Sequence, residues 1–403
     1  MAEFTRDDAA LRAGVERGYL DRLIGLAIIE PDADGRLTKG DVRRAKMALT
    51  LEGAGIAPDA LAAGLQSGHL SLEFMDLPSY QRFATLGTES FRQVSERTGV
   101  PLDLLMLVRE ATGGAVPDPD DRVREDELLV VPFILGQLHS GISARSVDRA
   151  LRVLGDSLRR AAETQGAAWR TDLMEPMLAR GATVSEVAAA STSEEADDLD
   201  QVADDAVLAI WHAQQAQAWT ANVIAGFEAI LTDAGLIAMT ARPPAICFLD
   251  ITGYTRLTSE RGDAAAADLA AGLNRLVTRT SVERGGKPVK WLGDGVMVHF
   301  RDPGPGVLAA LEMVEGVRDV GLPPAHVGIH AGPVLFQEGD YFGRTVNLAA
   351  RIAEYARPGE VLVTQEVVDE ASASRAGCRF TEIGPVELKG ISGPVHLHAA
   401  HRG

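Results

Sequence analysis

Cysteine, aromatic residues and long apolar runs are all scarce in this 403-residue sequence, which has two cysteines and 5% aromatic residues. Two cysteines in so long a chain do not make a disulfide framework, which indicates a reducing compartment. The longest apolar run, residues 128–138, is about half of what a bilayer requires. Residues 1–18 carry charges of both signs and no apolar stretch, so no targeting segment is predicted. We therefore expect a cytoplasmic protein without a membrane span.

Basic residues are also in short supply, because 39 Lys and Arg stand against 57 Asp and Glu, for a formal net charge of −18. Residues 1–240 hold 22 basic and 38 acidic side chains (−16), whereas residues 241–403 hold 17 and 19 (−2). An acidic surface repels phosphate backbones and anionic lipid, which argues against a nucleic-acid partner. Hydrophobic content of 46% is ordinary for globular proteins, and the length predicts two or three domains.

Residues 1–200 have the pattern of helices joined by short turns. A glycine followed by a small apolar residue precedes a helical pattern four times, at Gly55, Gly99, Gly141 and Gly181. Glycine suits the left-handed position that ends a helix, and Ser143 can cap the next helix, as can Thr183 in a capping box with Glu186. A helical repeat array has a similar period, but these units share little beyond the turn. We predict an all-α helical bundle.

Residues 91–110 have helix–turn–helix form, which raises the alternative of a DNA-binding regulator. A recognition helix presents basic and amide side chains to the DNA groove. The second helix here instead carries an apolar stripe of Leu102, Leu104, Leu105 and Leu107. We predict a buried helix of the bundle.

Residues 201–243 are expected to form a linker or transmitter helix. Apolar side chains recur every three to four positions at Trp219, Val223 and Phe227, and the pattern ends near Gly235. This segment is the only covalent path between the acidic half and the rest of the chain. One hypothesis is that this helix transmits a regulatory signal between the two halves. The alternative is that it only packs against other helices.

After Pro244 short β-branched runs alternate with amphipathic helical patterns over residues 254–283, 305–319 and 345–355. The order strand, helix, hairpin, helix, strand is that of the α+β ferredoxin-like (βαββαβ) plan, with extra strands. We predict such a domain over residues 244–403.

Two aspartates in this domain are expected to converge at one rim of the sheet. Asp250 ends the first predicted strand and Asp294 lies in the hairpin turn, and each alone is explained by helix capping or turn chemistry. Together with phosphate oxygens, two carboxylates are the ligands that Mg²⁺ or Mn²⁺ prefers. Other polar residues, each explicable alone as a surface or turn residue, are Lys290, Asp340, Asn347 and Arg351.

These residues, in this order, resemble the class III nucleotidyl cyclase catalytic domain. The family pattern reads D-I-x-G-[FY]-T, K-x-x-G-D, D-x-x-G-x-x-V-N-x-A-x-R and L-K-G. This sequence has DITGYT from residue 250, KWLGD from 290, DYFGRTVNLAAR from 340 and LKGI from 388. The resemblance covers about residues 244–398. Residues 1–240 more loosely resemble the helical regulatory domain ahead of some actinobacterial cyclases of this class.

The resemblance implies a role for each matching position. Asp250, the Ile251 carbonyl and Asp294 would hold two metal ions, Mg²⁺ or Mn²⁺; Lys290 and Asp340 would select adenine; Asn347 would position the ribose; Arg351 would contact the reacting phosphate; and Lys389 would reach the terminal phosphates. The implied enzyme is an adenylate cyclase that converts ATP into 3′,5′-cyclic AMP and pyrophosphate. It would act as a homodimer, whose composite sites take metal ligands from one subunit and the remaining residues from the other.

Base choice also follows from hydrogen-bond chemistry. Adenine offers an amino donor and a ring-nitrogen acceptor, which suit an aspartate and a lysine, whereas guanine offers the reverse. The alternatives are a guanylate or mixed-specificity cyclase and a catalytically silent nucleotide sensor. The segment between His330 and Asp340 is shorter than in the longer members of this family, in which it forms an arm that embraces the partner subunit. The helical half is therefore expected to supply dimer contacts.

The regulatory trigger has two hypotheses. His69, His139 and His212 titrate near neutral pH when unperturbed, which makes pH one of them. A small ligand within the bundle is the other.

Overall fold

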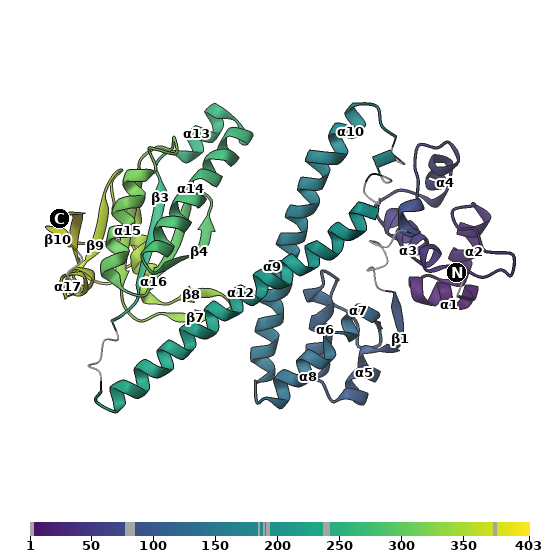
Figure 1. Ribbon diagram of the computed structural model, residues 1–403, viewed down its shortest axis with the longest axis horizontal. Helices are drawn as coiled ribbons and strands as arrows, with labels where there is room; N and C mark the ends of the chain where they lie inside the picture. Colours follow the sequence, from purple (N-terminus) through teal and green to yellow (C-terminus); the bar gives the residue numbers. More distant parts are fainter. Residues whose placement is uncertain are drawn as a thin grey trace. The chain divides into compact units, whose positions relative to one another are not determined.

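The structure is a computed structural model that describes residues 4–76, 85–183, 186–187, 190, 194–236, 242–373 and 377–403. The chain forms two compact units, Met1–Ala225 and Gly226–Gly403 (Figure 1). Across these ranges, no helix combines the length and the apolar character needed to cross a bilayer.

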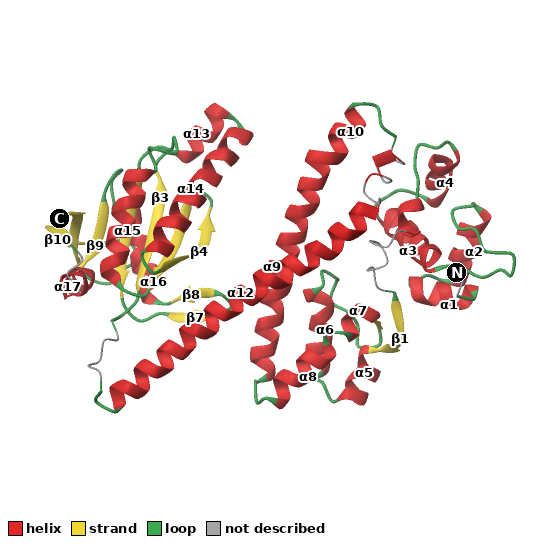
Figure 2. Ribbon diagram, in the orientation of Figure 1, coloured by secondary structure: helices red, strands yellow, loops and turns green. Residues whose placement is uncertain are grey.

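The first unit is almost entirely helical, as predicted (Figure 2). Its α-helices are α1 (Arg6–Ala13), α2 (Arg17–Gly25), α3 (Lys39–Gly53), α4 (Pro58–Gln66), α5 (Phe91–Thr98), α6 (Leu102–Ala111), α7 (Glu125–Leu128), α8 (Val131–His139), α9 (Ala144–Trp169) and α10 (Glu175–Ala179). The described residues of this unit also form a 3₁₀ turn, η1 (Glu73–Asp76), a π-helical turn, η3 (Arg170–Met174), and most of the long helix α12 (Glu194–Asp233). The all-α prediction is wrong in one detail, because β1 (Leu86–Ser90) and β2 (Arg122–Arg124) form a small antiparallel sheet.

The predicted turn chemistry is confirmed at the ends of these helices. The glycines at 55, 99, 141 and 181 all have φ between 74° and 93°, the left-handed region that few other residues adopt. The Ser143 hydroxyl accepts a hydrogen bond from the Ser146 amide and caps α9. The Glu186 carboxylate accepts from the Thr183 amide at 2.7 Å, and the Glu186 amide donates to the Thr183 hydroxyl at 3.2 Å. Local sequence thus determines where the helices begin and end.

Helix α6, the second helix of the helix–turn–helix pattern, is a core element. Leu104, Leu105 and Leu107 are each 2% exposed and pack with α5, α8 and α9. A separate core lies among α1 to α4, around Leu20, Leu23 and Leu37. The prediction that this helix is buried is therefore confirmed.

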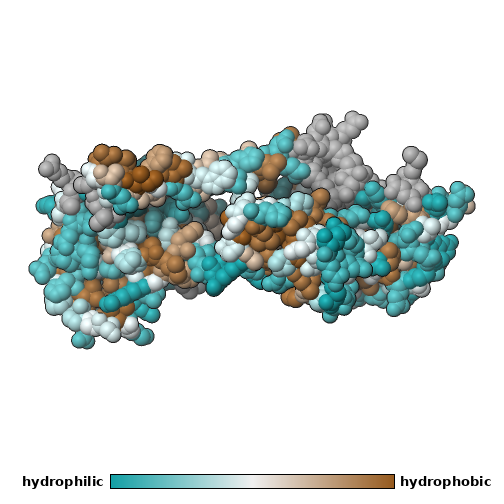
Figure 3. All heavy atoms as spheres, turned by 90° about the horizontal axis from the view of Figure 1, so that it is seen from below, coloured by the Kyte–Doolittle hydropathy of each residue, from teal (hydrophilic) through white to brown (hydrophobic). Residues whose placement is uncertain are grey.

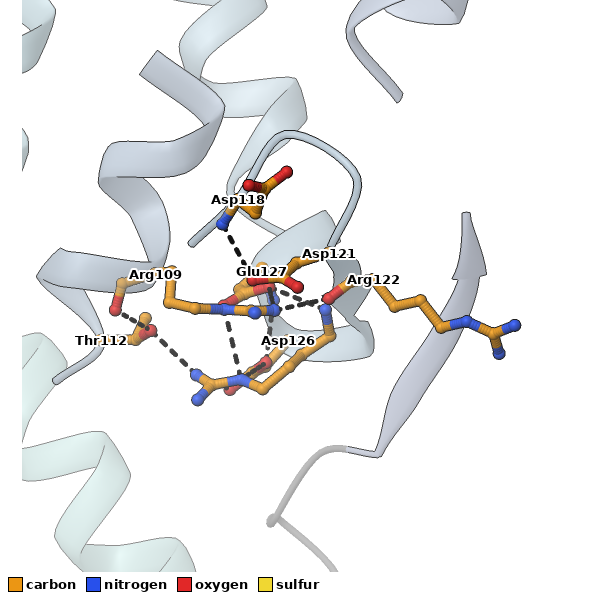
Figure 4. Close-up of polar contacts among 8 residues, drawn as sticks. Arg109, Thr112, Asp118, Asp121, Arg122, Asp126 and Glu127 are labelled. Carbon is orange, nitrogen blue, oxygen red and sulfur yellow. Dashed lines mark hydrogen bonds and ion pairs between the residues drawn. The ribbon is translucent and has the colours of Figure 1, made fainter. Parts of the chain in front are cut away.

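A buried polar network fixes α6 against α7 (Figure 4). The Arg109 guanidinium donates two hydrogen bonds to the Glu127 carboxylate, at 2.8 and 2.9 Å, and Glu127 is 1% exposed. The Arg124 amide donates to the same carboxylate at 2.7 Å, and its guanidinium bridges Asp126 and Thr112. Removing one partner would leave a buried charge unpaired, a change that costs about 3–5 kcal/mol.

The predicted linker helix is α12 (Glu194–Asp233), 40 residues long, which spans the boundary between the two units. Its apolar stripe is exposed: Trp219 is 65% exposed, Phe227 63% and Ile230 65%. More than half of each of these side chains is thus open to solvent. On the face drawn in Figure 3, hydrophobic residues lie in separate patches between hydrophilic ones.

The second unit is built on a seven-stranded mixed sheet with the order β10-β11-β9-β6-β3-β5-β4. Its strands are β3 (Ala245–Ile251), β4 (Gly286–Leu292), β5 (Gly295–Phe300), β6 (Ala325–Ala331), β9 (Val361–Thr364), β10 (Cys378–Val386) and β11 (Val395–Arg402). Strands β6 and β9 run parallel, and the other neighbours pair antiparallel. A separate short hairpin joins β7 (Leu335–Gln337) to β8 (Asp340–Phe342).

The helices of this unit differ from the sequence prediction in two places. They are α13 (Tyr254–Arg261), α14 (Asp263–Glu283), α15 (Pro303–Gly316), α16 (Arg344–Tyr355) and α17 (Gln365–Ala373). The single helix predicted over 254–283 is interrupted at Gly262, whose φ of 80° cannot continue an α-helix. Helix α17 follows β9 directly and was not predicted.

The two faces of the sheet are covered by different helices. Cys247 and Leu249 of β3 pack with α14, α15 and α17, whereas Ile246 and Phe248 pack with α16. Helix α16 lies close to β6 at Gly328, where an added Cβ would be 2.1 Å from the Ala353 nitrogen. Because side chains alternate along a strand, Asp250 lies on the same face as Ile246 and Phe248.

Candidate active site

Asp250 and Asp294 come together at the end of β3, as predicted. Asp250 is opposite Gly295 in the β3–β5 ladder, and Asp294 occupies the turn immediately before Gly295. An added Cβ on Gly295 would be 3.0 Å from Asp250 Oδ1, so the glycine leaves room for the carboxylate. Burial raises the pKa of the Asp250 carboxyl, and the negative charge of Asp294 raises this pKa further. A cation between the two carboxylates would relieve both effects.

The carboxylates of Asp250 and Asp294 fit a divalent metal that takes most of its ligands from the nucleotide and from water. In the described ranges, no three His, Cys, Asp or Glu side chains are grouped to hold an ion. Two carboxylates would thus leave coordination positions for phosphate oxygens and water, the arrangement common at Mg²⁺–nucleotide sites. Ile251, predicted to offer its carbonyl, is 1% exposed in the core, and its amide donates to the Asp250 carboxylate.

Lys290 and Asp340 form a direct ion pair, with Lys290 Nζ 2.5 Å from Asp340 Oδ2. Lys290 lies on β4, and Asp340 begins β8, where its other oxygen accepts a hydrogen bond from the Tyr341 amide at 2.7 Å. Their side chains are 37% and 24% exposed, so both remain accessible to a ligand. The ring of Phe342 lies 5.9 Å from Lys290 Nζ. The structure therefore places a donor, an acceptor and an aromatic ring together.

Asn347 and Arg351 form a second group on α16. Val346 and Ala349 of this helix are buried against the sheet, whereas Asn347 is exposed and Arg351 is half-exposed. Both line a cavity of about 770 Å³ together with Arg344 and Gly390. The Arg351 guanidinium is held by the Glu354 carboxylate at 2.6 Å.

Lys389 is exposed in the turn between β10 and β11, next to Gly390 of this cavity. Within the described residues, no hydrogen bond or ion pair joins Asn347 or Arg351 to Asp250 or Asp294.

Sequence reasoning missed His326, which lies beside Asp250. The two residues are opposite one another in the β3–β6 ladder, and His326 Nε2 is 3.5 Å from Asp250 Oδ2. The contact depends on the register between two strands 76 residues apart in sequence, which no local motif reveals.

Comparisons with known proteins divide the chain in the same order. Residues 61–209 match the model of the adenylate cyclase regulatory domain, and residues 239–401 match the model of the adenylate and guanylate cyclase catalytic domain.

Two relatives align with this chain over most of their length. The chain is 32% identical to a pH-sensitive adenylate cyclase of Mycobacterium tuberculosis over 330 residues, 78% of each chain. It is 28% identical to an adenylate cyclase of Streptomyces coelicolor over 79% of each chain. Among solved structures, the adenylyl cyclase CyaB of P. aeruginosa is similar to 40% of this chain over 95% of its own, with 24% identity and a TM-score of 0.36.

Proposed function

The chain belongs to the class III adenylate and guanylate cyclases, with an adenylate cyclase regulatory domain before the catalytic domain, and we propose that it converts ATP into 3′,5′-cyclic AMP and pyrophosphate. The sheet order β6-β3-β5-β4 supports a ferredoxin-like core for the catalytic unit. The observation that supports ATP as the substrate is the Lys290–Asp340 pair. A carboxylate that accepts from the adenine amino group and an ammonium that donates to N1 distinguish adenine from guanine.

The carboxylates of Asp250 and Asp294, with the Ile251 carbonyl, are proposed to hold two divalent cations, Mg²⁺ or Mn²⁺. When bound, these ions lower the pKa of the ribose 3′-hydroxyl and neutralise charge on the triphosphate. Gly295 keeps the space beside Asp250 open for this purpose. The chain's own contribution here is to hold two carboxylates close together despite their repulsion.

The groups on α16 are proposed to act on the sugar and the reacting phosphate. The Asn347 amide positions the ribose so that its 3′-oxygen is in line with the departing pyrophosphate. Arg351 supplies a planar cation to the α-phosphate oxygens, for which it exchanges its Glu354 partner for the substrate. Lys389, in its exposed turn, reaches the terminal phosphates.

These two sets of groups are proposed to meet in a homodimer. In support, Asn347 and Arg351 lie on the exposed side of α16, whereas Val346 and Ala349 pack against the sheet that carries Asp250. A second copy would bring Lys290, Asp340, Asn347 and Arg351 to the aspartates of the first, and the symmetric arrangement gives two equivalent sites.

A mixing experiment tests the composite site. D250N and R351A variants should each be inactive as purified, whereas their mixture should recover up to about a quarter of wild-type activity through heterodimers that retain one intact site. A mixture as inactive as its components, while the wild type is active, would show that each protomer forms its own site.

Regulation by the first unit is proposed to act through α12. At the catalytic end of this helix Glu228 pairs with Arg301, beside a cavity of about 800 Å³ that Arg242 and Asp302 also line. A change in the end point or packing of α12 would alter this contact. Equal hydrogen-exchange protection of α12 in active and inactive protein would contradict this role.

The trigger of this regulation is proposed to be pH or a small ligand. The relative from M. tuberculosis is described as pH-sensitive, and His69, His139 and His212 are exposed in this chain. Replacing each histidine by Gln should shift the pH–activity profile if pH acts through it. An unchanged profile in all three variants would favour a small ligand.

A further inference from the structure

His326 contacts two residues at the end of β3 at once. Its Nε2 lies 3.5 Å from Asp250 Oδ2, and its Nδ1 lies 3.2 Å from the Thr252 hydroxyl. The side chain is 13% exposed, so the ring has little freedom to turn away. Asp250 and Thr252 are two residues apart on one chain segment, and the imidazole bridges them from the neighbouring strand.

This arrangement selects one form of the ring. The contact of a ring nitrogen with a carboxylate is favourable only when the nitrogen carries a hydrogen, so Nε2 is the donor. Nδ1 of the neutral ring is then an acceptor, and the Thr252 hydroxyl can donate to it. The neutral tautomer thus satisfies both contacts, and no charge on the ring is required.

The two oxygens of Asp250 therefore have different surroundings. Oδ2 faces the imidazole, whereas Oδ1 lies against the backbone of Gly295. Carboxylates that bind metals are usually oriented by hydrogen bonds from neighbouring groups, and loss of such a group typically lowers metal affinity about 10- to 100-fold. Without His326, the Asp250 carboxylate would lose one of the groups that orient it beside the charge of Asp294, and the Ile251 amide would remain.

We propose that His326 is a positioning residue for the metal site: its Nε2–H orients the Asp250 carboxylate, and the Thr252 hydroxyl fixes the ring tautomer. The inference rests on the proposed function, in which Asp250 binds a divalent cation. His326 does not contact the nucleotide and takes no proton from it.

The test measures Mn²⁺ binding to the full chain by electron paramagnetic resonance, with the α,β-methylene analogue of ATP, which cannot release pyrophosphate. H326L, which lacks any donor, should weaken Mn²⁺ binding about 10- to 100-fold. H326Q places an amide N–H near the position of Nε2 and should restore binding to within a few fold of wild type. H326N, whose shorter amide does not reach that position, should resemble H326L.

The matched control is H330L on the same strand. His330 is similarly buried, but it is opposite Ile246 in the ladder and hydrogen-bonds Thr364. Its loss should leave Mn²⁺ affinity unchanged. With ATP as substrate, H326L should raise the Mn²⁺ concentration for half-maximal activity and recover most of kcat at saturating Mn²⁺.

Two results would overturn the proposal while the metal site stands. In one, H326L binds Mn²⁺ as tightly as wild type. In the other, H326Q is as weak as H326L although both keep the wild-type melting temperature, which would make the ring a packing group only. Failure of the wild type itself to bind Mn²⁺ with the analogue would instead refute the metal assignment of Asp250, and this inference with it.

Discussion

Removal of either member of the Lys290–Asp340 pair should lower activity with ATP far more than activity with GTP. Hydrogen bonds that involve a charged group contribute about 1.5–3 kcal/mol, or about 10- to 150-fold in kcat/KM. Because the two side chains are 37% and 24% exposed, water competes for both, and we expect the lower part of this range. K290A and D340A should each reduce kcat/KM for ATP about 10- to 30-fold.

The contact between Lys290 and Asp340 should also couple the effects of the two substitutions. Lys290 Nζ and Asp340 Oδ2 are 2.5 Å apart, so each side chain holds the other in place. The double variant should therefore lose less than the product of the two single losses. K290E combined with D340C, which reverses the donor and acceptor pattern, should increase the GTP-to-ATP preference.

The assay is initial-rate formation of cyclic nucleotide from ATP and from GTP with Mn²⁺, separated by chromatography. Lys287 gives a matched control, because it lies on the same strand and contacts the rings of Phe336 and Tyr341 instead of Asp340. K287A should keep the ATP preference. Equal reduction of kcat/KM for both nucleotides in K290A and D340A would refute the assignment of this pair to the base.

Three further perturbations probe the site and its support. D250N should abolish cyclase activity, yet raise the melting temperature of metal-free protein at neutral pH in calorimetry, because the folded-state pKa of Asp250 is raised and its ionisation therefore destabilises the fold as pH rises. Burial, and secondarily the charge of Lys287, lower the pKa of His299 to about 4. The free energy of unfolding should therefore decrease by up to about 3 kcal/mol as the pH falls from 6.5 to 4. Urea titrations should show this decrease for the wild type and not for H299F. G328A should displace α16, costing about 1–3 kcal/mol in urea unfolding and reducing kcat. G359A strains a left-handed turn position but would contact no neighbouring atom, so it should spare kcat. Unchanged melting in D250N, equal slopes for H299F and wild type, or normal kcat in G328A would each count against the corresponding explanation.

The family and the enzyme class could be predicted from sequence because their motifs are local. DITGYT and KWLGD each place an aspartate at a strand end or a hairpin turn, where backbone chemistry already favours it. The comparisons confirm the predicted class of enzyme. The four turn glycines and the capping box at Thr183 were also predictable, since their geometry depends on a few adjacent residues.

Features that depend on distant residues could not be predicted. The contact of His326 with Asp250 requires the β3–β6 register, and the β1–β2 sheet pairs segments more than thirty residues apart. The break at Gly262 was not predicted because helical segments lie directly before and after it. For α12, periodicity predicted the helix correctly but could not show that its apolar stripe is exposed.

The most direct test of the central claim is the conversion of ATP by the purified full chain with Mn²⁺, with cyclic AMP and pyrophosphate quantified together. The proposed function predicts equal amounts of the two products, little product from GTP, and none from D294N. Nucleotide binding without any cyclic product, under conditions in which the wild-type protein is folded and dimeric, would contradict it and favour a nucleotide sensor.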